Sequence, residues 1–191
     1  MTLQAGNTTT VNLSAYNNNW YKPGAGFVKR TVWFCINGLF FINPMNPLSS
    51  LKVWLLRMFG ASVGKGVVIK PMVNIKYPWL LNIGNHVWIG ENVWIDNLAQ
   101  VTIEDNVTLS QGAMLLTGSH NYKKNTFDLI IGSIILEEGV WIGAKAIVCP
   151  GLICYTHSIL TAGSVATQNL AAYTIFQGNP ATPKRERIIT P

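Results

Sequence analysis

Aliphatic side chains recur at every sixth position through the middle of the chain, from Val63 to Leu160. Two short slips and one long break interrupt the pattern. Fourteen positions carry it, and all but one are Val, Ile or Leu: Val63, Ile69, Ile75, Ile83, Ile89, Ile95, Ile103, Leu109, Leu115, Leu136, Ile142, Val148, Cys154 and Leu160. A helix repeats its buried face about every 3.6 residues and a strand every second residue, so neither element produces this period. The pattern therefore indicates an internal repeat of six residues.

Each unit of six has further regularities that predict its shape. The residue after the aliphatic position is often Gly, as at Gly90 and Gly143, and the residue four places on is usually small or β-branched, as at Val93 and Ala146. A short strand followed by a corner fits such a unit, and three units close one triangular coil of a parallel β-helix. Because each coil buries its aliphatic residues only against its neighbours, several coils are needed, and about five are expected here. The predicted fold class is all-β.

The segment before the repeat has a different character. Residues 1–25 are polar and rich in Asn and Thr, which predicts an irregular arm. The ranges 27–42 and 48–59 have helical lengths, with a strong breaker at 43–47 between them. We expect the two helices to cap the β-helix, because its open end otherwise presents unpaired strand edges. Their aromatic and basic residues also suit contact with a membrane interface, and the two interpretations can coexist.

Two further segments depart from the repeat. The break at about 116–135 is too long for a corner, so it is predicted to be an extruded loop, and such loops on rigid scaffolds often carry function. After a turn at 177–181, the chain is expected to end in a basic segment with some helix. The predicted organisation is an N-terminal arm with helices at 1–62, a β-helix at 63–172 and a basic tail at 173–191.

Composition and charge restrict the classes of function. Apolar residues make up 49% of the 191 residues and charged residues 12%, a balance that excludes disorder for most of the chain. The net charge of +6 suits an anionic partner. No block of five or more Lys or Arg occurs, so nucleic acid is not expected as a partner.

The cysteines and the apolar stretches bear on localisation. Cys35, Cys149 and Cys154 are odd in number and lack a Cys-x-x-Cys spacing, which argues against disulfides and thiolate zinc and suits a reducing compartment. The N-terminal residues are too polar for a signal peptide, and the longest apolar stretch, 32–42, is too short to span a bilayer as a helix. We expect a cytoplasmic protein, with a peripheral contact at the inner face of the membrane left open.

Several motifs narrow the identification. They are Arg57-Met58-Phe59-Gly60-Ala61, Tyr77-Pro78-Trp79, Trp88-Ile89-Gly90-Glu91, Thr117-Gly118-Ser119-His120-Asn121, Trp141-Ile142-Gly143-Ala144 and Gly178-Asn179-Pro180-Ala181. With them the chain resembles the hexapeptide-repeat acyltransferases, and within these the colanic-acid and exopolysaccharide biosynthesis acetyltransferases. The resemblance implies a left-handed parallel β-helix, a homotrimer, and transfer of an acetyl group from acetyl-CoA to a sugar hydroxyl. The acceptor would be a surface polysaccharide or its precursor, as a sugar or a lipid-linked saccharide.

The resemblance also suggests how the reaction runs. A sugar hydroxyl must lose its proton as it attacks, and a neutral imidazole, with an ordinary pKa of ~6.5, can accept it. His120 stands in the motif in which the family carries its catalytic histidine, so it is the candidate general base, and Asp128 is a candidate to orient its ring. His86 and His157 fall at mid-unit positions and are expected to be surface residues. No Ser or Cys stands in a nucleophile elbow, so we expect direct transfer in a ternary complex.

Binding residues for both substrates follow from the same resemblance. Acetyl-CoA would contact the backbone of the later coils, at Gly143, Ala144, Ala162 and Gly163, where small residues permit close approach. Two basic residues of the tail, Lys184 and Arg185, and their neighbour Arg187 are candidates for the CoA phosphates, with a solvated tail as the alternative.

One residue departs from the family pattern, and two others are candidates for the acceptor site. Gln168 stands where the family often has a Lys near the nucleotide phosphate, which leaves its role open. Asp96 and Asn97, at the second slip of the repeat, are candidates to bind sugar hydroxyls, with Trp88 or Trp94 as a stacking face. A simple turn is the alternative for Asp96 and Asn97.

Two other functions compete with this interpretation. A zinc lyase of the γ-carbonic-anhydrase type uses the same β-helix but needs three imidazoles, and Asn125 stands where the third would be expected. No metal is therefore expected. A β-helix that serves as a non-catalytic scaffold predicts no binding of acetyl-CoA.

Overall fold

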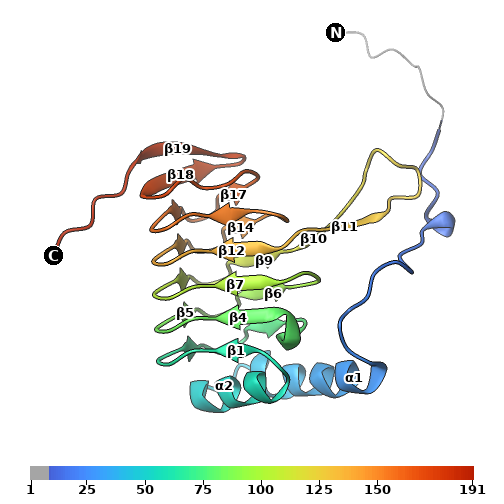
Figure 1. The fold of residues 1–191 in the computed structure, drawn as a ribbon, viewed down its shortest axis with the longest axis horizontal. Coiled ribbons are helices and arrows are strands. Elements are labelled where there is room, and N and C mark those ends of the chain that lie inside the picture. Colours follow the sequence, from blue (N-terminus) through green and yellow to red (C-terminus); the bar gives the residue numbers. More distant parts are fainter. Residues whose placement is uncertain (1–8) are drawn as a thin grey trace, which may run out of the picture.

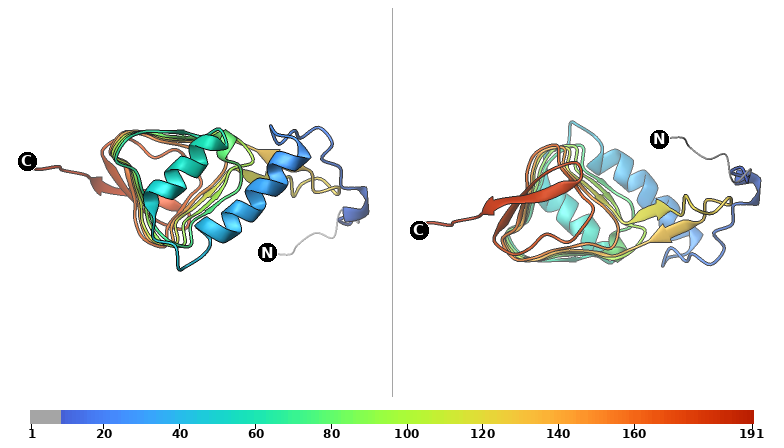
Figure 2. Two further views of the ribbon diagram at one scale, coloured as in Figure 1. Left: turned by 90° about the horizontal axis from the view of Figure 1, so that it is seen from below. Right: turned by 90° about the horizontal axis from the view of Figure 1, so that it is seen from above.

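A triangular parallel β-helix forms the body of the molecule (Figures 1 and 2). In the computed structural model, which describes residues 9–191, five successive coils each contribute one short strand to three sheets. Sheet A consists of β1 (Ser62–Val63), β4 (Leu81–Ile83), β7 (Val101–Ile103), β12 (Ile134–Leu136) and β15 (Ile153–Cys154). Sheet B includes β2 (Val68–Ile69), β5 (Trp88–Ile89), β8 (Thr108–Leu109), β13 (Trp141–Ile142) and β16 (Ile159–Leu160). Sheet C consists of β3 (Asn74–Ile75), β6 (Trp94–Asp96), β9 (Met114–Leu116), β14 (Ile147–Val148) and β17 (Val165–Ala166).

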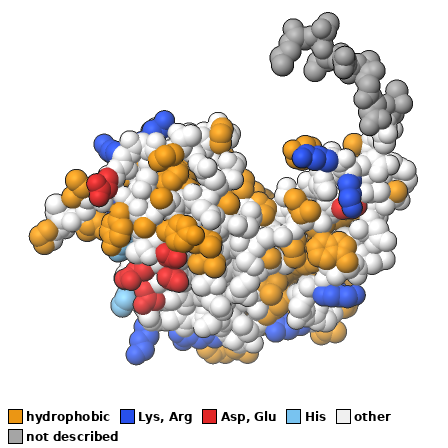
Figure 3. Space-filling view, turned by 45° about the horizontal axis from the view of Figure 1, so that its top comes forward, with side chains coloured by type: hydrophobic (Ala, Val, Ile, Leu, Met, Phe, Trp, Pro, Cys, Tyr) orange, Lys and Arg blue, Asp and Glu red, His pale blue; other side chains and the backbone are white. Residues whose placement is uncertain are grey.

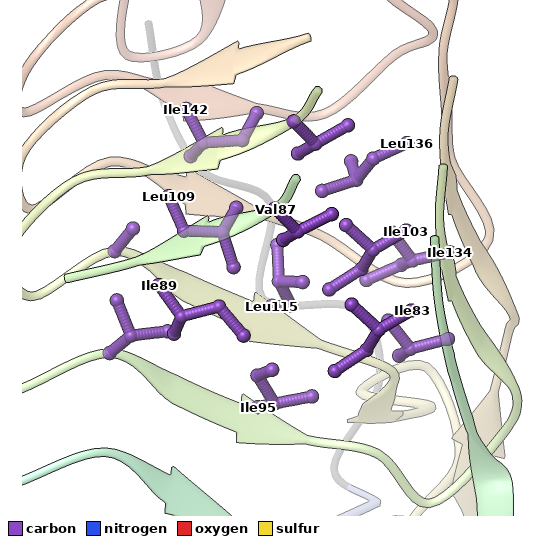
Figure 4. Packing of buried hydrophobic residues seen from close by; sticks show 14 of the residues in the cluster. Ile83, Val87, Ile89, Ile95, Ile103, Leu109, Leu115, Ile134, Leu136 and Ile142 are labelled. Carbon is purple, nitrogen blue, oxygen red and sulfur yellow. The ribbon is translucent and has the colours of Figure 1, made fainter. Parts of the chain in front are cut away.

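The period of six is confirmed by the core. All fourteen aliphatic positions are buried, and none is more than 9% exposed. Parallel pairing stacks each side chain on its counterpart in the next coil, as in the column Ile69, Ile89, Leu109 and Ile142. Figure 4 shows the last three members of this column. The hydrogen-bonded strands of the three sheets surround these columns. The interior of the β-helix is therefore a continuous stack of apolar side chains.

Corner residues explain why the strands are so short. At the corner between sheets A and B the backbone turns through a left-handed conformation, with φ of +66° at Gly66, +54° at His86 and +55° at His157. A left-handed residue ends a strand and redirects the chain toward the next face. His86 and His157 are therefore corner residues; His86 is exposed, as expected, and His157 is partly buried.

The N-terminal helices cap the first coil, as expected. Helix α1 (Phe27–Ile36) continues into a π-helical turn, η2 (Asn37–Phe41), and α2 (Ser49–Met58) crosses beneath β1 and β2 (Figure 2). Lys52 is fully buried, and its Nζ donates to the carbonyl of Lys70 at 2.8 Å, while Arg57 donates to the carbonyl of Val63. Burial lowers the pKa of Lys52. Cationic side chains thus satisfy carbonyl groups that the first coil leaves unpaired.

The far end of the β-helix differs from the expected basic tail. Strands β18 (Thr174–Gly178) and β19 (Ala181–Glu186) form an antiparallel hairpin, and β18 extends sheet B by pairing with β16. Leu170 also bridges Cys154 in sheet A, so a partial sixth coil closes this end. The expectation of helix here was wrong, because the open edge of β16 offers hydrogen-bond partners that an extended segment can use.

The break in the repeat does leave the coil, but it is more ordered than a loop. Strands β10 (Gly118–His120) and β11 (Leu129–Ile131) pair as an antiparallel hairpin that projects from the corner between β9 and β12 (Figure 1). The N-terminal arm, residues 9–26, contains a short 3₁₀ turn, η1 (Leu13–Ala15), and runs from α1 to this hairpin. A second 3₁₀ turn, η3 (Pro78–Leu80), marks the first slip of the repeat.

Candidate active site

The base of the projecting hairpin is anchored to the coil below by one threonine. Thr117 is fully buried; its Oγ1 donates to the carbonyl of Asp96 at 2.9 Å and accepts from the N–H of Ala99 at 3.0 Å. Across the hairpin base, the N–H of Gly132 donates to the carbonyl of Thr117 at 2.9 Å. These bonds hold the first residues of β10 in one position relative to the β-helix.

His120 ends β10 with its ring held in a defined orientation. Nδ1 lies 2.9 Å from the carbonyl oxygen of Phe127, and the ring stacks on that of Phe127 with centroids 4.6 Å apart and planes 7° apart. A carbonyl can only accept, so Nδ1 carries the hydrogen and Nε2 of the neutral ring is left as an acceptor. This tautomer is the one that a general base needs.

Asp128 does not orient His120, although the sequence made it a candidate. Its carboxylate accepts from Nζ of Lys124 at 2.8 Å and from the hydroxyl of Thr126 at 2.6 Å, and these bonds lower its pKa. The Phe127 carbonyl takes the orienting role instead. Sequence reasoning could not find this partner, because any residue can supply a backbone carbonyl.

The N-terminal arm encloses the space in front of His120. Tyr21 donates to the carbonyl of Leu98 at 2.9 Å, Trp79 donates to the carbonyl of Pro23 at 2.6 Å, and the ring of Tyr16 lies 5.9 Å from that of His120. Burial raises the pKa of Tyr21, so its hydroxyl stays a neutral donor. The result is a cavity of about 570 Å³, here called the histidine cavity, lined by Tyr16, Tyr21, Lys22, Arg30, Lys76 and His120 among others.

The sequence did not predict that this arm would line the cavity. Its aromatic residues, Tyr16, Trp20 and Tyr21, are the signal that the sequence offers, because aromatic side chains in a largely polar segment suggest a docking surface. The volume of the cavity falls within the range of about 300–1,000 Å³ that is usual for small-molecule sites.

Asp96 and Asn97 have different roles. Asp96 is partly exposed, and its Oδ1 lies 2.9 Å from Nζ of Lys76 in an ion pair. Asn97 is fully buried; its side chain accepts from the N–H of Tyr77 and donates to the carbonyls of Tyr77 and Leu80. These bonds occupy the amide of Asn97. It holds the corner together, as the turn interpretation allowed.

The four expected cofactor contacts lie together at another corner. Gly143 and Ala144 follow β13, and Ala162 and Gly163 follow β16, so both pairs turn the chain from sheet B to sheet C, and the N–H of Gly163 donates to the carbonyl of Ala144 at 2.8 Å. A Cβ on Gly143 would lie 2.5 Å from the backbone nitrogen of Ala162, so stacking of the coils itself requires this glycine. Gly163 is exposed and has nothing within 4 Å of such a Cβ.

Two basic residues of the tail are exposed, and a third is hydrogen-bonded to the coils. Lys184 and Arg185 are exposed on β19. Arg187 instead donates to the carbonyls of Gly139 at 2.9 Å and His157 at 3.1 Å, which fastens the terminal hairpin to the coils. Gln168 is exposed and donates to the carbonyl of Ala181 at 3.4 Å.

Within residues 9–191, no three His, Cys, Asp or Glu side chains come together in a group that could hold a metal ion. His86 and His157 lie at corners between sheets A and B, whereas His120 projects from the corner between sheets C and A. The three imidazoles of one chain therefore do not converge.

Comparison with known proteins identifies relatives along most of the chain. No model of a protein family matches it. It is 34% identical over 167 residues to the colanic acid biosynthesis acetyltransferase WcaF of Escherichia coli K12, which covers 87% of this chain and 92% of that one. It is also 29% identical over 136 residues to the galactoside O-acetyltransferase of the same organism, covering 69% and 66% of the two chains.

A solved structure supports the fold. The hexapeptide-repeat acetyltransferase VCA0836 of Vibrio cholerae superposes with a TM-score of 0.75 at 25% identity, covering 83% of this chain and 90% of that one. The protein therefore belongs to the hexapeptide-repeat acetyltransferases, within the branch of the colanic acid biosynthesis acetyltransferases, and its β-helix is the left-handed one of that family.

Proposed function

We propose that this protein transfers an acetyl group from acetyl-CoA to a sugar hydroxyl of a surface polysaccharide or its precursor, with His120 as the general base. The observation that carries the proposal is the orientation of His120. Its Nδ1 faces the carbonyl of Phe127 at 2.9 Å, so Nε2 is free to accept a proton, and the ring lines a cavity of about 570 Å³. Relatives named as acetyltransferases, one of them acting on galactosides, support the reaction class.

The proposed step needs no covalent enzyme intermediate. Nε2 of His120 accepts the proton of the acceptor hydroxyl as its oxygen bonds to the thioester carbonyl carbon. The carbon–sulfur bond then breaks, and the proton passes from His120 to the CoA thiolate. Burial raises the pKa of Cys154 to about 12 and also raises that of Cys149. A raised pKa keeps each side chain a neutral thiol, which is a poor nucleophile.

The placement of the two substrate sites supports an active site shared between chains. His120 projects from one end of sheet C, at the corner beyond β9, whereas Ala144 and Gly163 lie at its other end, between sheets B and C. One chain thus holds its base and its expected cofactor corner at different corners of the triangle. We propose a homotrimer in which the hairpin of one subunit meets the corner of the next.

Exposure distinguishes the candidate cofactor contacts. We propose that Ala144, Ala162 and Gly163 line the path of the pantetheine arm, because Ala162 and Gly163 are exposed and Gly163 leaves open space in front of its Cα. Gly143 would contribute through close stacking of the coils. Lys184 and Arg185 remain proposed contacts for the CoA phosphates.

The outer surface of the N-terminal helices supports a peripheral membrane contact. Within the described chain, neither helix has the length and apolar character that crossing a bilayer requires. Phe27, Phe34 and Trp54 are nonetheless 74%, 77% and 56% exposed. We propose that this surface rests on the inner face of the membrane of a cytoplasmic enzyme. Sedimentation with anionic vesicles should pellet the wild type, and a Phe27→Ser/Phe34→Ser double variant should stay in the supernatant.

An acetyl-transfer assay tests the proposed function. The enzyme is incubated with acetyl-CoA and a panel of glycosides, and free CoA is quantified by chromatography, because Cys35 is exposed and would react with thiol reagents. We expect His120→Ala to lower kcat by about 10²–10⁴-fold, the usual contribution of general-base catalysis. The matched control is His86→Asn, at a corner whose φ of +54° suits Asn. Full turnover by His120→Ala would refute the role of this histidine.

A further inference from the structure

Phe127 has an unusual backbone conformation for its residue type. Its φ is +53°, in the left-handed region that bulky side chains rarely adopt. Among the described residues, seven other non-glycine residues have a positive φ, and all of them lie at corners of the coils. They are Met72, His86, Asn92, Asn106, Lys145, His157 and Tyr173. The geometry of the repeat accounts for those seven, whereas Phe127 lies outside the coils, in the projecting hairpin.

A turn by itself does not explain a phenylalanine at this position. The N–H of Phe127 donates to the carbonyl of Lys124 at 3.1 Å, so the chain makes a tight turn here and leaves it through a left-handed residue. Gly and Asn adopt that conformation more readily and are the usual residues after such a turn. Backbone strain that another residue would relieve tends to persist where it serves a functional site.

Both the backbone and the ring of Phe127 contact His120. The carbonyl oxygen lies 2.9 Å from Nδ1, and the phenyl ring lies parallel to the imidazole, with centroids 4.6 Å and planes 7° apart. The carbonyl determines which nitrogen carries the hydrogen, and the ring determines the plane in which the other nitrogen points. A glycine at this position could keep the carbonyl contact but would lose the flat one.

The carboxylate of Asp128 holds the tip of the hairpin, residues 121–128, around Phe127. Its two oxygens accept from the hydroxyl of Thr126 at 2.6 Å and from Nζ of Lys124 at 2.8 Å, so the first of these bonds bridges the residues on either side of Phe127. Figure 3 shows that the hairpin and the arm form a lobe that projects from the body of the β-helix. No residue of the tip is buried, so its shape depends on its own bonds.

We propose that Phe127 is a positioning residue for His120: its carbonyl sets the tautomer, its ring sets the plane of the imidazole, and the bonds of Asp128 hold it in the conformation that does both. This inference rests on the proposed function, because it assumes that His120 acts as the base. Acetyl transfer requires Nε2 to meet the acceptor hydroxyl at hydrogen-bond distance, and a displacement of about 1 Å can lower the rate by ~10²-fold. A residue can therefore control turnover without touching either substrate.

Three substitutions at position 127 separate the carbonyl from the ring. Phe127→Tyr keeps both contacts and should retain the wild-type kcat. Phe127→Asn suits the left-handed conformation but lacks the aromatic ring, so its kcat should fall by about tenfold. Phe127→Val, whose branched side chain disfavours a positive φ, loses both contacts and should lower kcat by about 10²-fold, with an unchanged KM for acetyl-CoA. Wild-type kcat in Phe127→Val, or an equal loss in all three variants, would overturn the inference.

The matched control is Asn106→Val, at a corner between sheets A and B. Asn106 has a φ of +60°, so the control places the same branched side chain in the same backbone conformation, at a corner that does not carry the hairpin. It should lower the thermal transition, because Val fits that conformation poorly, and leave kcat unchanged. If Asn106→Val loses as much kcat as Phe127→Val, the loss reports general instability and the inference is rejected.

The tautomer of His120 provides a readout that needs no turnover. Long-range proton–nitrogen NMR spectra of histidine-labelled protein, recorded where the rings are neutral, distinguish a hydrogen on Nδ1 from one on Nε2. The His120→Ala variant identifies the signals of His120. We expect the hydrogen on Nδ1 in the wild type and in Phe127→Tyr, and a shift toward the Nε2 form in Phe127→Val. An unchanged tautomer in Phe127→Val would contradict the inference.

A double variant tests the part played by Asp128. Asp128→Ala should lower kcat, and Phe127→Val/Asp128→Ala should be no slower than Phe127→Val alone, because the carboxylate acts by holding Phe127. Losses that multiply in the double variant would show that Asp128 acts by another route and would remove it from the inference.

The inference and the proposed function can fail separately. If His120→Ala is inactive while Phe127→Val keeps both its kcat and its tautomer, the proposed function stands and the inference fails. If Phe127→Val changes the tautomer but the wild type acetylates no acceptor, the positioning role of Phe127 stands and the proposed function fails.

Discussion

Replacement of Thr117 by Val tests whether one hydroxyl holds the hairpin that carries His120 in place. Val carries a methyl group where Thr carries its hydroxyl, so the substitution removes the hydrogen bonds of the hydroxyl and changes the shape of the side chain little. Thr117 is fully buried, and its hydroxyl bonds to two backbone groups of the coil below. The hairpin that it anchors ends in His120. The substitution is therefore expected to change both stability and turnover.

The magnitude follows from the bonds that are lost. The N–H of Ala99 loses its acceptor, and a buried donor without a partner costs ~1–3 kcal/mol. The carbonyl of Asp96 keeps the N–H of Thr117 as a donor at 3.2 Å, so losing the hydroxyl there costs only ~0.5–1.5 kcal/mol. The extra buried methyl group returns ~0.8 kcal/mol. We therefore expect the free energy of unfolding to fall by about 1–4 kcal/mol.

Urea denaturation at a fixed protein concentration measures this change, since oligomerisation makes stability depend on concentration. The control is Thr108→Val in β8, where the hydroxyl makes no side-chain hydrogen bond within the described residues, and this variant should lie within about 0.5 kcal/mol of the wild type. In the acetyl-transfer assay, Thr117→Val should show a lower kcat than Thr108→Val. Equal stability and equal kcat for the two variants would refute the anchoring role.

Two further predictions concern the β-helix itself. Leu109→Ala, between Ile89 and Ile142 in a fully buried column, should lower the free energy of unfolding by about 3–5 kcal/mol in urea, because the stacked coils cannot collapse into the cavity. Bonds from the side chain and backbone of Asn85 hold the pKa of Asp105 below its ordinary value of 3.8. Its carboxylate thus stabilises the fold above pH 3.8, and this is lost as pH falls through the lowered pKa, so Asp105→Asn should unfold with a weaker acid dependence in pH-dependent urea titrations.

Much of the architecture could be predicted from the sequence because its cause is local. A unit of six residues contains one buried side chain, one corner and one short strand, and each coil repeats the same solution. The predictions of the buried aliphatic positions and of the cap formed by α1 and α2 were therefore correct. The end of the chain was not, because its conformation depends on the open edge of β16, a neighbour that the tail meets only in the folded state.

The site was predictable to a smaller extent. The motif singled out His120, which stays a proposed general base, and Ala162 and Gly163, which stay proposed cofactor contacts, lie at the corner between sheets B and C. Asn97 was a candidate for the acceptor site, with a turn as the alternative, and its amide is occupied by the backbone of the preceding slip. Asp128 was a candidate partner of His120, but a backbone carbonyl takes that place. In both cases the sequence identifies a polar side chain and leaves its bonding partner undetermined.

The order of hydrophobic residues was sufficient to predict the β-helix, since the period of six is visible in the sequence alone. The cavity in front of His120 has no such record. It exists because Tyr21 contacts Leu98, 77 positions away, and because Arg30 of α1 comes to line it together with Lys76 of the first slip. Only the path of the folded chain brings these residues together, because an arm without periodicity carries no signal of where it will dock.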